Sequence, residues 1–308
     1  MVVTQLLSFC GKFSRRLPLP YHSHSACRLS FFKCPYSAAA RERLASKDRE
    51  REKVEVNGVK LHYERSGSGS HVVLCMPGAL GSAVTDFGPQ LKYFGEEHGD
   101  LYTCVSFDPR GYGSSRPPKR DFHTEPEIFL KTDARDAHAL MKTFGFPSFS
   151  ILGWSDGGVS AIVLAARYPE AVKKLIVWGA NAYVAREDVE LFEKTRNVNY
   201  WSRRMREPLE AMYGSDFPQM WSDWIDAMTT VYNSTKDGSL CMPELSHIKC
   251  PTLILHGVKD PLCLHFHAEY LRDHIKESKL ELFSEGKHNL HLRFAKEFNL
   301  KVTEFLAK

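Results

Sequence analysis

The stretch FSILGWSDGGVSAIVLAARYPE, residues 149–170, decides the fold. It begins as a short apolar run, typical of a strand buried on both faces, and continues with small and apolar residues at helical spacing as far as Pro169. The pattern G-x-S-x-G lies between the two, at residues 153–157. A sharp strand-to-helix turn needs glycine where the backbone is crowded, and it would hold Ser155 in a strained conformation above the edge of a sheet. The stretch therefore predicts a serine nucleophile on an α/β scaffold.

The alternation of apolar runs and helical stretches continues on both sides of residues 149–170. Further apolar runs that end in loop residues occupy 71–78, 101–111, 174–181, 252–260 and 280–288. Helical spacing is found in 126–145, 265–276 and 290–307. Strands that are buried on both faces and alternate with helices predict a doubly wound, mostly parallel sheet of the α/β class.

Two segments depart from this alternation. Residues 54–65 read VEVNGVKLHYER, which is two alternating runs joined by Asn57-Gly58. Because this dipeptide accepts the positive φ angles of a tight turn, the segment predicts an antiparallel hairpin that opens the sheet. Residues 182–248 are helical, aromatic and irregular, and they lie between two predicted strands. We interpret them as a helical cap inserted over the carboxyl edge of the sheet.

Charge is unevenly distributed along the chain. The formal net charge is +4, but the first 53 residues carry +7, which leaves −3 for the rest. No Asp or Glu occurs before Glu42, whereas six Lys or Arg and many Ser do. This composition favours a mitochondrial transit peptide over a secretory signal, which needs a longer apolar region; a disordered basic tail is the alternative. We therefore predict a transit peptide and linker over 1–46, an α/β domain over 47–308, and a mitochondrial location.

Composition also argues against several classes of partner and cofactor. The body of the chain is mildly acidic, so we expect no nucleic-acid partner, and no apolar run approaches the roughly 18 residues of a membrane-spanning helix. The eight cysteines include no C-x-x-C pair, and we expect free thiols, with Cys75 and Cys104 buried in strands. His265 and His267 have no matching carboxylate cluster for a metal, and no nucleotide-binding motif is present. We expect a monomer without cofactor, metal or membrane contact.

Ser155 needs a base, and the base needs an acid that holds it in the right tautomer. In this architecture the acid follows the serine along the chain and the histidine comes last. Asp260 and His288 fit that order, because each lies in the loop after a predicted strand and so at the edge where Ser155 stands. His291 falls inside a predicted helix and His256 at the end of a predicted strand, so we expect both to be structural.

An oxyanion hole is expected beside Ser155. The N-terminus of the helix that follows the serine aims free N–H groups at the developing oxyanion, and the N–H of Asp156 is the first donor. The second donor should come from MPGALGS, residues 76–82, where Gly78 allows a close approach of the backbone. The N–H of Ala79 or that of Leu80 can serve, and we prefer Ala79.

Six motifs together resemble one family. PGALGS, FDPRGYGSSRPP, LGWSDGG, VWGANAYV, HGVKDPL and EGKHNLHLRFA are similar to the biphenyl hydrolase-like, or valacyclovir hydrolase, family of the α/β-hydrolase superfamily, from about Val54 to the C-terminus. The resemblance implies an α/β-hydrolase fold and a serine hydrolase of α-amino acid esters, including amino-acid ester prodrugs. It also implies Ser155, Asp260 and His288 as the triad, and an association with mitochondria.

Asp156 raises a separate question, because a carboxylate beside an oxyanion hole opposes the anion by about 1 kcal/mol or more. An ester of an α-amino acid carries an ammonium group two bonds from the carbonyl carbon that Ser155 would attack. Asp156 could bind that ammonium, and a pair about 4 Å apart at an effective dielectric near 20 gains about 4 kcal/mol before desolvation. The alternative is an internal partner such as Arg110. We expect substrate binding, partly because of the family resemblance.

Several rival functions use the same scaffold. A carbon–carbon bond hydrolase of ring-cleavage products has the same triad, but its anionic substrates would meet Asp156. Dehalogenases and epoxide hydrolases of this fold need an aspartate in place of Ser155. A non-catalytic binding protein of the α/β-hydrolase fold would be expected to lose a member of the triad, and none is lost. We therefore predict a serine esterase acting on small-molecule esters with a free α-amino group.

Overall fold

The computed structural model describes residues 49–308 except 123–127 and 236. The predicted transit peptide, residues 1–46, and the cysteines within it lie outside the described residues. No helix in the described part of the chain is both long enough and apolar enough to cross a membrane.

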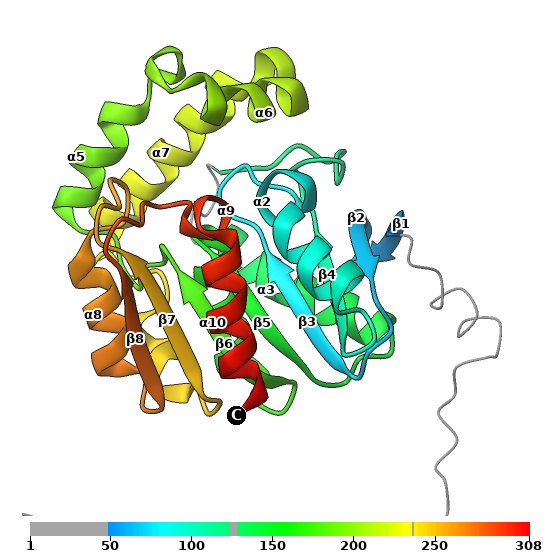
Figure 1. Ribbon diagram of the computed structural model, residues 1–308. Helices are drawn as coiled ribbons and strands as arrows, with labels where there is room; N and C mark the ends of the chain where they lie inside the picture. The colour runs from blue at the N-terminus through cyan, green and yellow to red at the C-terminus, as the bar shows by residue number, and fades with distance from the viewer. Residues whose placement is uncertain (1–48, 123–127, 236) are drawn as a thin grey trace, which may run out of the picture. The chain divides into compact units, whose positions relative to one another are not determined.

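An eight-stranded sheet forms the centre of the described chain (Figure 1). Its strands are β1 (Glu50–Val56), β2 (Val59–Ser66), β3 (His71–Met76), β4 (Tyr102–Phe107), β5 (Phe149–Trp154), β6 (Val172–Trp178), β7 (Thr252–Gly257) and β8 (Ser278–Phe283). Their spatial order is β1-β2-β4-β3-β5-β6-β7-β8. Strand β2 pairs antiparallel with β1 and β4, and the pairs from β4 through β8 are parallel. The predicted mostly parallel sheet is confirmed.

The hairpin that opens the sheet turns at Asn57 and Gly58, as predicted. Both residues have positive φ, at 48° and 77°, which is the conformation that a type I′ turn requires. Val56 then pairs directly with Val59. The turn therefore fixes the register of β1 on β2.

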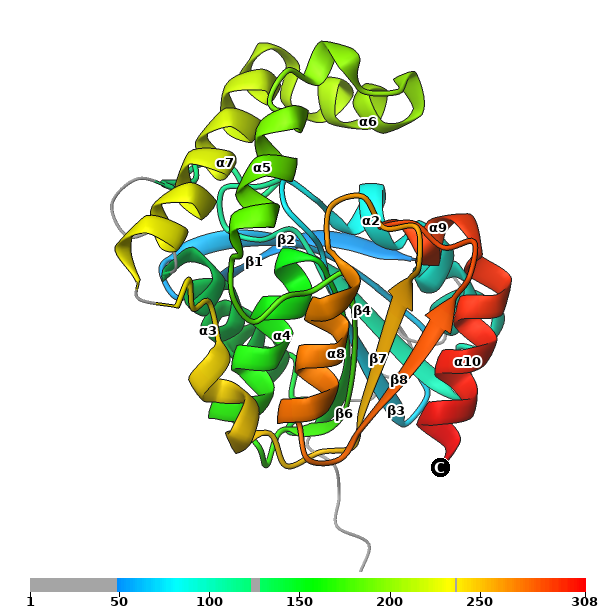
Figure 2. The same cartoon turned by 90° about the vertical axis from the view of Figure 1, so that its left-hand side faces the viewer.

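Helices cover both faces of the sheet (Figure 2). One face carries α3 (Ile128–Thr143), α4 (Asp156–Arg167) and α8 (His265–His274), whose apolar side chains join one buried cluster. The other face carries α2 (Ala83–Gln90), the π-helical turn η1 (Leu91–Glu97) and α10 (Ala295–Ala307), whose side chains join a second cluster. This arrangement is the doubly wound sheet predicted from the alternating pattern.

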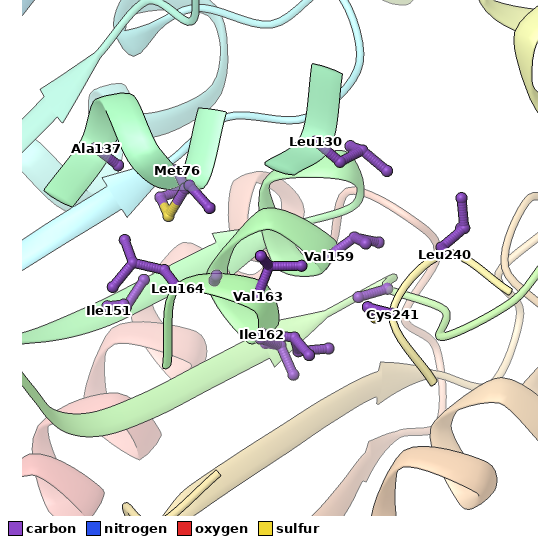
Figure 3. Close-up of a cluster of buried hydrophobic side chains, with 14 of the residues drawn as sticks. Met76, Leu130, Ala137, Ile151, Val159, Ile162, Val163, Leu164, Leu240 and Cys241 are labelled. Carbon is purple, nitrogen blue, oxygen red and sulfur yellow. The ribbon is translucent and has the colours of Figure 1, made fainter. Parts of the chain in front are cut away.

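Helix α4 lies in the middle of the larger cluster (Figure 3). Its residues from Asp156 to Ala165 are all buried, and its side chains Val159, Ile162 and Leu164 pack among those of the neighbouring elements. Small residues in the first turn let the helix approach the sheet closely. The rigid packing of α4 fixes the position of its N-terminus, where Ser155 lies.

Two helical regions differ from the sequence pattern. We made no prediction for the segment between β3 and β4, which α2 and η1 occupy. Ser82 and Thr85 cap the start of α2, and Phe87 and Phe94 are buried. The helix predicted over 290–307 is divided into α9 (Leu290–Arg293) and α10. Phe294 leaves the helical region (φ −116°, ψ 39°).

A helical cap lies between β6 and β7. Its helices are α5 (Arg186–Thr195), α6 (Arg203–Tyr213) and α7 (Phe217–Ser234), with the short turns η2 (Val198–Tyr200), η3 (Gly214–Asp216) and η4 (Met242–His247). Figures 1 and 2 place α5, α6 and α7 beyond the carboxyl ends of the parallel strands. This is the edge at which ligands bind in open α/β sheets.

The cysteines of the described chain are free and buried. Cys75 and Cys104 lie on neighbouring strands with their Sγ atoms 3.8 Å apart. Both lie inside the sheet core, as predicted.

Candidate active site

Ser155 lies at the junction of β5 and α4 with φ 55° and ψ −124°. A positive φ at a residue other than glycine is strained, and the neighbouring glycines permit it. A Cβ atom on Gly153 would come within 2.7 Å of the carbonyl oxygen of Gly157, and a Cβ on Gly157 would collide with the backbone oxygen of Met76. The crowded strand-to-helix turn predicted from G-x-S-x-G is therefore present.

His288 and Asp260 are in contact. Nδ1–H of His288 donates to Oδ2 of Asp260 at 2.9 Å, and Oδ1 of Asp260 also accepts from the backbone N–H groups of Leu262 and Cys263. Burial by itself would raise the pKa of Asp260, but the charge and hydrogen bond of His288 and these N–H groups hold it below its usual value. An ionised Asp260 keeps the proton on Nδ1 of His288, so Nε2 can accept a proton from Ser155.

The competing histidines have other partners. His291 is buried, accepts a hydrogen bond at Nδ1 from the indole of Trp178, and donates from Nε2 to the carbonyl oxygen of Asp86, both at 2.9 Å. Burial lowers the pKa of His291 to about 3 and that of His256 to about 4. Both nitrogens of His291 are engaged, which leaves His288 as the candidate base.

The loop after β3 is held in place by Asp86, whose Oδ2 accepts from the N–H of Gly78 at 3.0 Å. Ala79 lines the cavity at Ser155, whereas Leu80 is buried and its carbonyl oxygen accepts from the hydroxyl of Tyr213 at 2.7 Å. Ala79, the preferred second donor of the oxyanion hole, therefore lines the same cavity as Ser155, and Leu80 lies behind it in the core.

The Asp156 side chain is buried, and its Oδ2 accepts from the indole N–H of Trp224 on α7 at 2.8 Å. The alternative partner Arg110 is bonded to Asp136 instead, at 2.9 Å. Within the described residues no cation forms an ion pair with Asp156. Burial raises the pKa of Asp156 to about 7, against the hydrogen bond of Trp224 and the charge of Arg120.

A cavity of about 410 Å³ joins these groups. Ser155, Asp156 and His288 line it from the core, and the cap contributes most of its aromatic wall: Phe192, Trp201, Trp221 and Trp224. Trp221 stacks on Trp224 with ring centroids 4.7 Å apart, so the cap holds the indole that contacts Asp156. Sequence reasoning missed Trp224, because nothing in its spacing distinguishes it from the cap's other aromatic residues.

The histidines considered for a metal serve other contacts. Nε2 of His267 lies 2.7 Å from Oδ2 of Asp188, and both side chains are buried, while His265 lies beside Glu269. In the described part of the chain, no group of three or more His, Cys, Asp or Glu side chains could hold a metal ion.

The arrangement can support nucleophilic acyl transfer. A strained serine, a histidine oriented by an ionised aspartate and two backbone donors are the parts that an acyl-enzyme reaction needs. The buried carboxyl group of Asp156 lines the same cavity as the nucleophile.

Comparisons with known proteins point in the same direction. Residues 71–197 match the family model described as the alpha/beta hydrolase fold. The chain is 51% identical over 255 residues to the Homo sapiens protein "Serine hydrolase BPHL", and this match covers 82% of the chain and 85% of the human protein. The Mus musculus protein of the same name is 50% identical over the same length.

Solved structures share the fold at low sequence identity. An esterase (EaEST) from Exiguobacterium antarcticum has a TM-score of 0.68 and 22% identity, over 84% of this chain and 100% of the esterase. A meta-cleavage product hydrolase (CumD) from Pseudomonas fluorescens IP01 has a TM-score of 0.66 and 21% identity, over 83% of this chain and 97% of that one. At these identities the likeness establishes the α/β fold and no activity.

Proposed function

The chain belongs to the family of serine hydrolase BPHL, within the α/β-hydrolase fold, and from this premise we propose that it hydrolyses esters of α-amino acids. The observation that carries the proposal is the place of Asp156. Its carboxyl group is buried, lines the cavity beside Ser155, and forms no ion pair among the described residues. A free α-ammonium group on the substrate would supply a cationic partner.

The reaction follows from the groups in the cavity. Ser155 attacks the ester carbonyl while His288 takes its proton, and the N–H groups of Asp156 and Ala79 stabilise the tetrahedral oxyanion. His288 then protonates the departing alcohol and leaves an acyl-enzyme on Ser155. Water, activated by the same histidine, attacks the acyl-enzyme and releases the amino acid.

The buried environment of Asp156 favours a substrate that carries a positive charge. Burial raises the pKa of this carboxyl to about 7, so at neutral pH its negative charge is only partly developed beside the oxyanion hole. A nearby ammonium favours the ionised carboxylate. The same residue can then bind the ammonium with its side chain and the oxyanion with its backbone.

A carbon–carbon bond hydrolase is the second candidate, since a meta-cleavage product hydrolase shares the fold. The observation against it is again Asp156, because an anionic substrate would lie beside a carboxyl group whose ionisation it opposes. A binding protein without catalysis is disfavoured because Ser155 and His288 line one cavity and His288 is bonded to Asp260.

We also propose that the basic segment 1–46 directs the protein to mitochondria. The support is its composition, in which positive charge and serine are common and acidic residues are absent before Glu42.

A panel of three benzyl esters tests the proposed specificity. The acyl groups are valine, N-acetylvaline and isovalerate, which share a branched carbon skeleton and differ in charge at the α position. We expect kcat/KM for the valine ester to exceed the other two by about 10²-fold or more, from a buried ion pair worth a few kcal/mol. Equal rates on all three would refute amino-acid ester specificity while leaving an esterase.

A further inference from the structure

The buried and the exposed parts of the cavity lining carry different ionisable groups. Beside Ser155 it is lined by the buried carboxyl groups of Asp156 and Asp86. Its exposed lining residues include the cations Arg204, Lys287 and Arg293. Arg204 lies on α6 of the cap, whereas the other two lie on the core segment that carries His288. In Figure 2, α6 extends over the part of the molecule where α9 lies.

The local sequence leaves Arg204 without an acidic partner. On α6, Arg203 pairs with Glu207 and Arg206 pairs with Glu210, each one helical turn further on. The residue one turn beyond Arg204 is Pro208. Arg204 therefore lines the cavity and forms no ion pair within the described chain.

The two core cations are also left without an ion pair among the described residues. Glu285, the nearest acidic residue in sequence to Lys287, is bonded to Lys259. Arg293 contacts the ring of Phe294, with its guanidinium carbon 5.6 Å from the ring centroid. Most other arginines of the described chain form ion pairs, so Arg204 and Arg293 are exceptions whose charge an anionic ligand would satisfy.

The chemistry of the triad says which part of a substrate reaches these cations. The acyl group carries the ammonium and so lies toward Asp156 and Trp224, which are buried. His288 must protonate the leaving oxygen, so the alcohol lies beside His288. Lys287 is the preceding residue, and Arg293 follows on the same segment. The alcohol therefore extends toward these cations.

We infer that the preferred substrates are amino-acid esters whose leaving group carries a negative charge, bound by Arg204, Lys287 and Arg293. The inference rests on the proposed function and adds the class of the leaving group. The recognised chemistry is a carboxylate or a phosphate, since a guanidinium binds both in the same forked geometry.

Esters in two series separate this inference from the proposed function. The acyl group is valine or isovalerate, and the alcohol is 4-carboxybenzyl or its neutral isostere 4-carbamoylbenzyl. The leaving-group ratio is kcat/KM for the carboxyl ester divided by that for the carbamoyl ester. The acyl ratio, valine over isovalerate, reports on the proposed function alone. A 4-phosphonobenzyl ester distinguishes phosphate from carboxylate as the favoured anion.

We expect a leaving-group ratio of about tenfold in the wild type, in both acyl series. Arg204→Gln and Arg293→Gln should each lower it about twofold, and the double variant about fourfold, because exposed pairs are individually weak and Lys287 remains. Raising the salt concentration from 0.05 to 0.5 M should lower the wild-type ratio through screening. Arg203→Gln is the matched control, since it removes the adjacent charge on α6 outside the cavity lining, and it should leave the ratio unchanged.

A wild-type ratio near one, or an equal effect of Arg203→Gln and Arg204→Gln, would overturn the inference. An acyl ratio near one together with a leaving-group ratio of about tenfold would refute the amino-acid specificity. It would still support the anion-binding site. Circular dichroism of each variant confirms that these exposed substitutions leave the fold intact.

Discussion

Trp224→Phe removes one hydrogen bond from the buried carboxyl group that is proposed to bind the substrate ammonium. The indole N–H donates to Oδ2 of Asp156 at 2.8 Å and lowers the pKa of that carboxyl, which burial has raised to about 7. Phenylalanine keeps an aromatic ring against the stacked Trp221 but offers no donor. A hydrogen bond to a charged group contributes about 1.5–3 kcal/mol, so its loss should raise the pKa of Asp156 by about 1–2 units.

The consequence is a shift in pH dependence that is specific to amino esters. Binding of the ammonium needs an ionised Asp156, so kcat/KM for a valine ester should fall as the pH is lowered through about 7. In Trp224→Phe this acidic limb should move to higher pH, and the rate at pH 7 should fall by about 5- to 50-fold, as the ionised fraction falls from one half.

The assay is kcat/KM against pH for paired valine and isovalerate esters, in the wild type and the variant. The isovalerate profile reports on the rest of the catalytic machinery and should move little. Equal losses on both esters with unmoved acidic limbs would mean that Trp224 only supports the cap, and the reasoning about Asp156 would then be wrong.

Three further predictions concern the catalytic site and the predicted transit peptide, residues 1–46. Ser155→Ala and His288→Ala should each lower kcat by about 10⁶-fold in an ester assay. His291→Gln should mainly lower the free energy of unfolding, measured in urea. Comparable kinetic losses at the two histidines would contradict the assignment of the base. Asp156→Asn should raise the free energy of unfolding by about 1–3 kcal/mol at pH 8 and by little at pH 4. The folded pKa of Asp156 lies above its unfolded value, so ionisation of this carboxyl destabilises the folded protein as the pH rises, and asparagine does not ionise. Urea denaturation at the two pH values checks the sign. Mass spectrometry of protein from mitochondria should give a mature N-terminus between about Cys34 and Lys53, and intact Met1 in a cytosolic fraction would defeat the targeting proposal.

The sequence was sufficient for the features that depend on local pattern and chain order. The stretch around Ser155 predicted the strand, the turn and the helix, because the crowding that requires Gly153 and Gly157 arises within a few residues. Asp260 and His288 could be placed together because carboxyl ends of parallel strands share one edge of a sheet.

The remaining features depend on contacts between distant segments. Trp224 reaches Asp156 from a cap helix 68 positions away, and no periodicity marks that contact. Helix α2 was not predicted, because Gly88 and Pro89 are poor helix formers. Burial of Phe87 in the tertiary structure stabilises the helix. The cluster of cations at the cavity could not be predicted either. Arg204 on the cap lines the same cavity as Lys287 and Arg293 on the core, although the two segments are far apart in the sequence.

The most direct test of the account is the acyl ratio in wild type and Asp156→Asn, measured with valine and isovalerate esters of one alcohol at pH 7. Asparagine keeps the backbone N–H for the oxyanion and an oxygen for Trp224, and it removes only the charge. The predicted result is a fall of about 10²- to 10³-fold on the valine ester, equivalent to roughly 3–4 kcal/mol, with the isovalerate ester unchanged or faster. An equal fall on both esters would contradict the claim that Asp156 selects amino-acid esters.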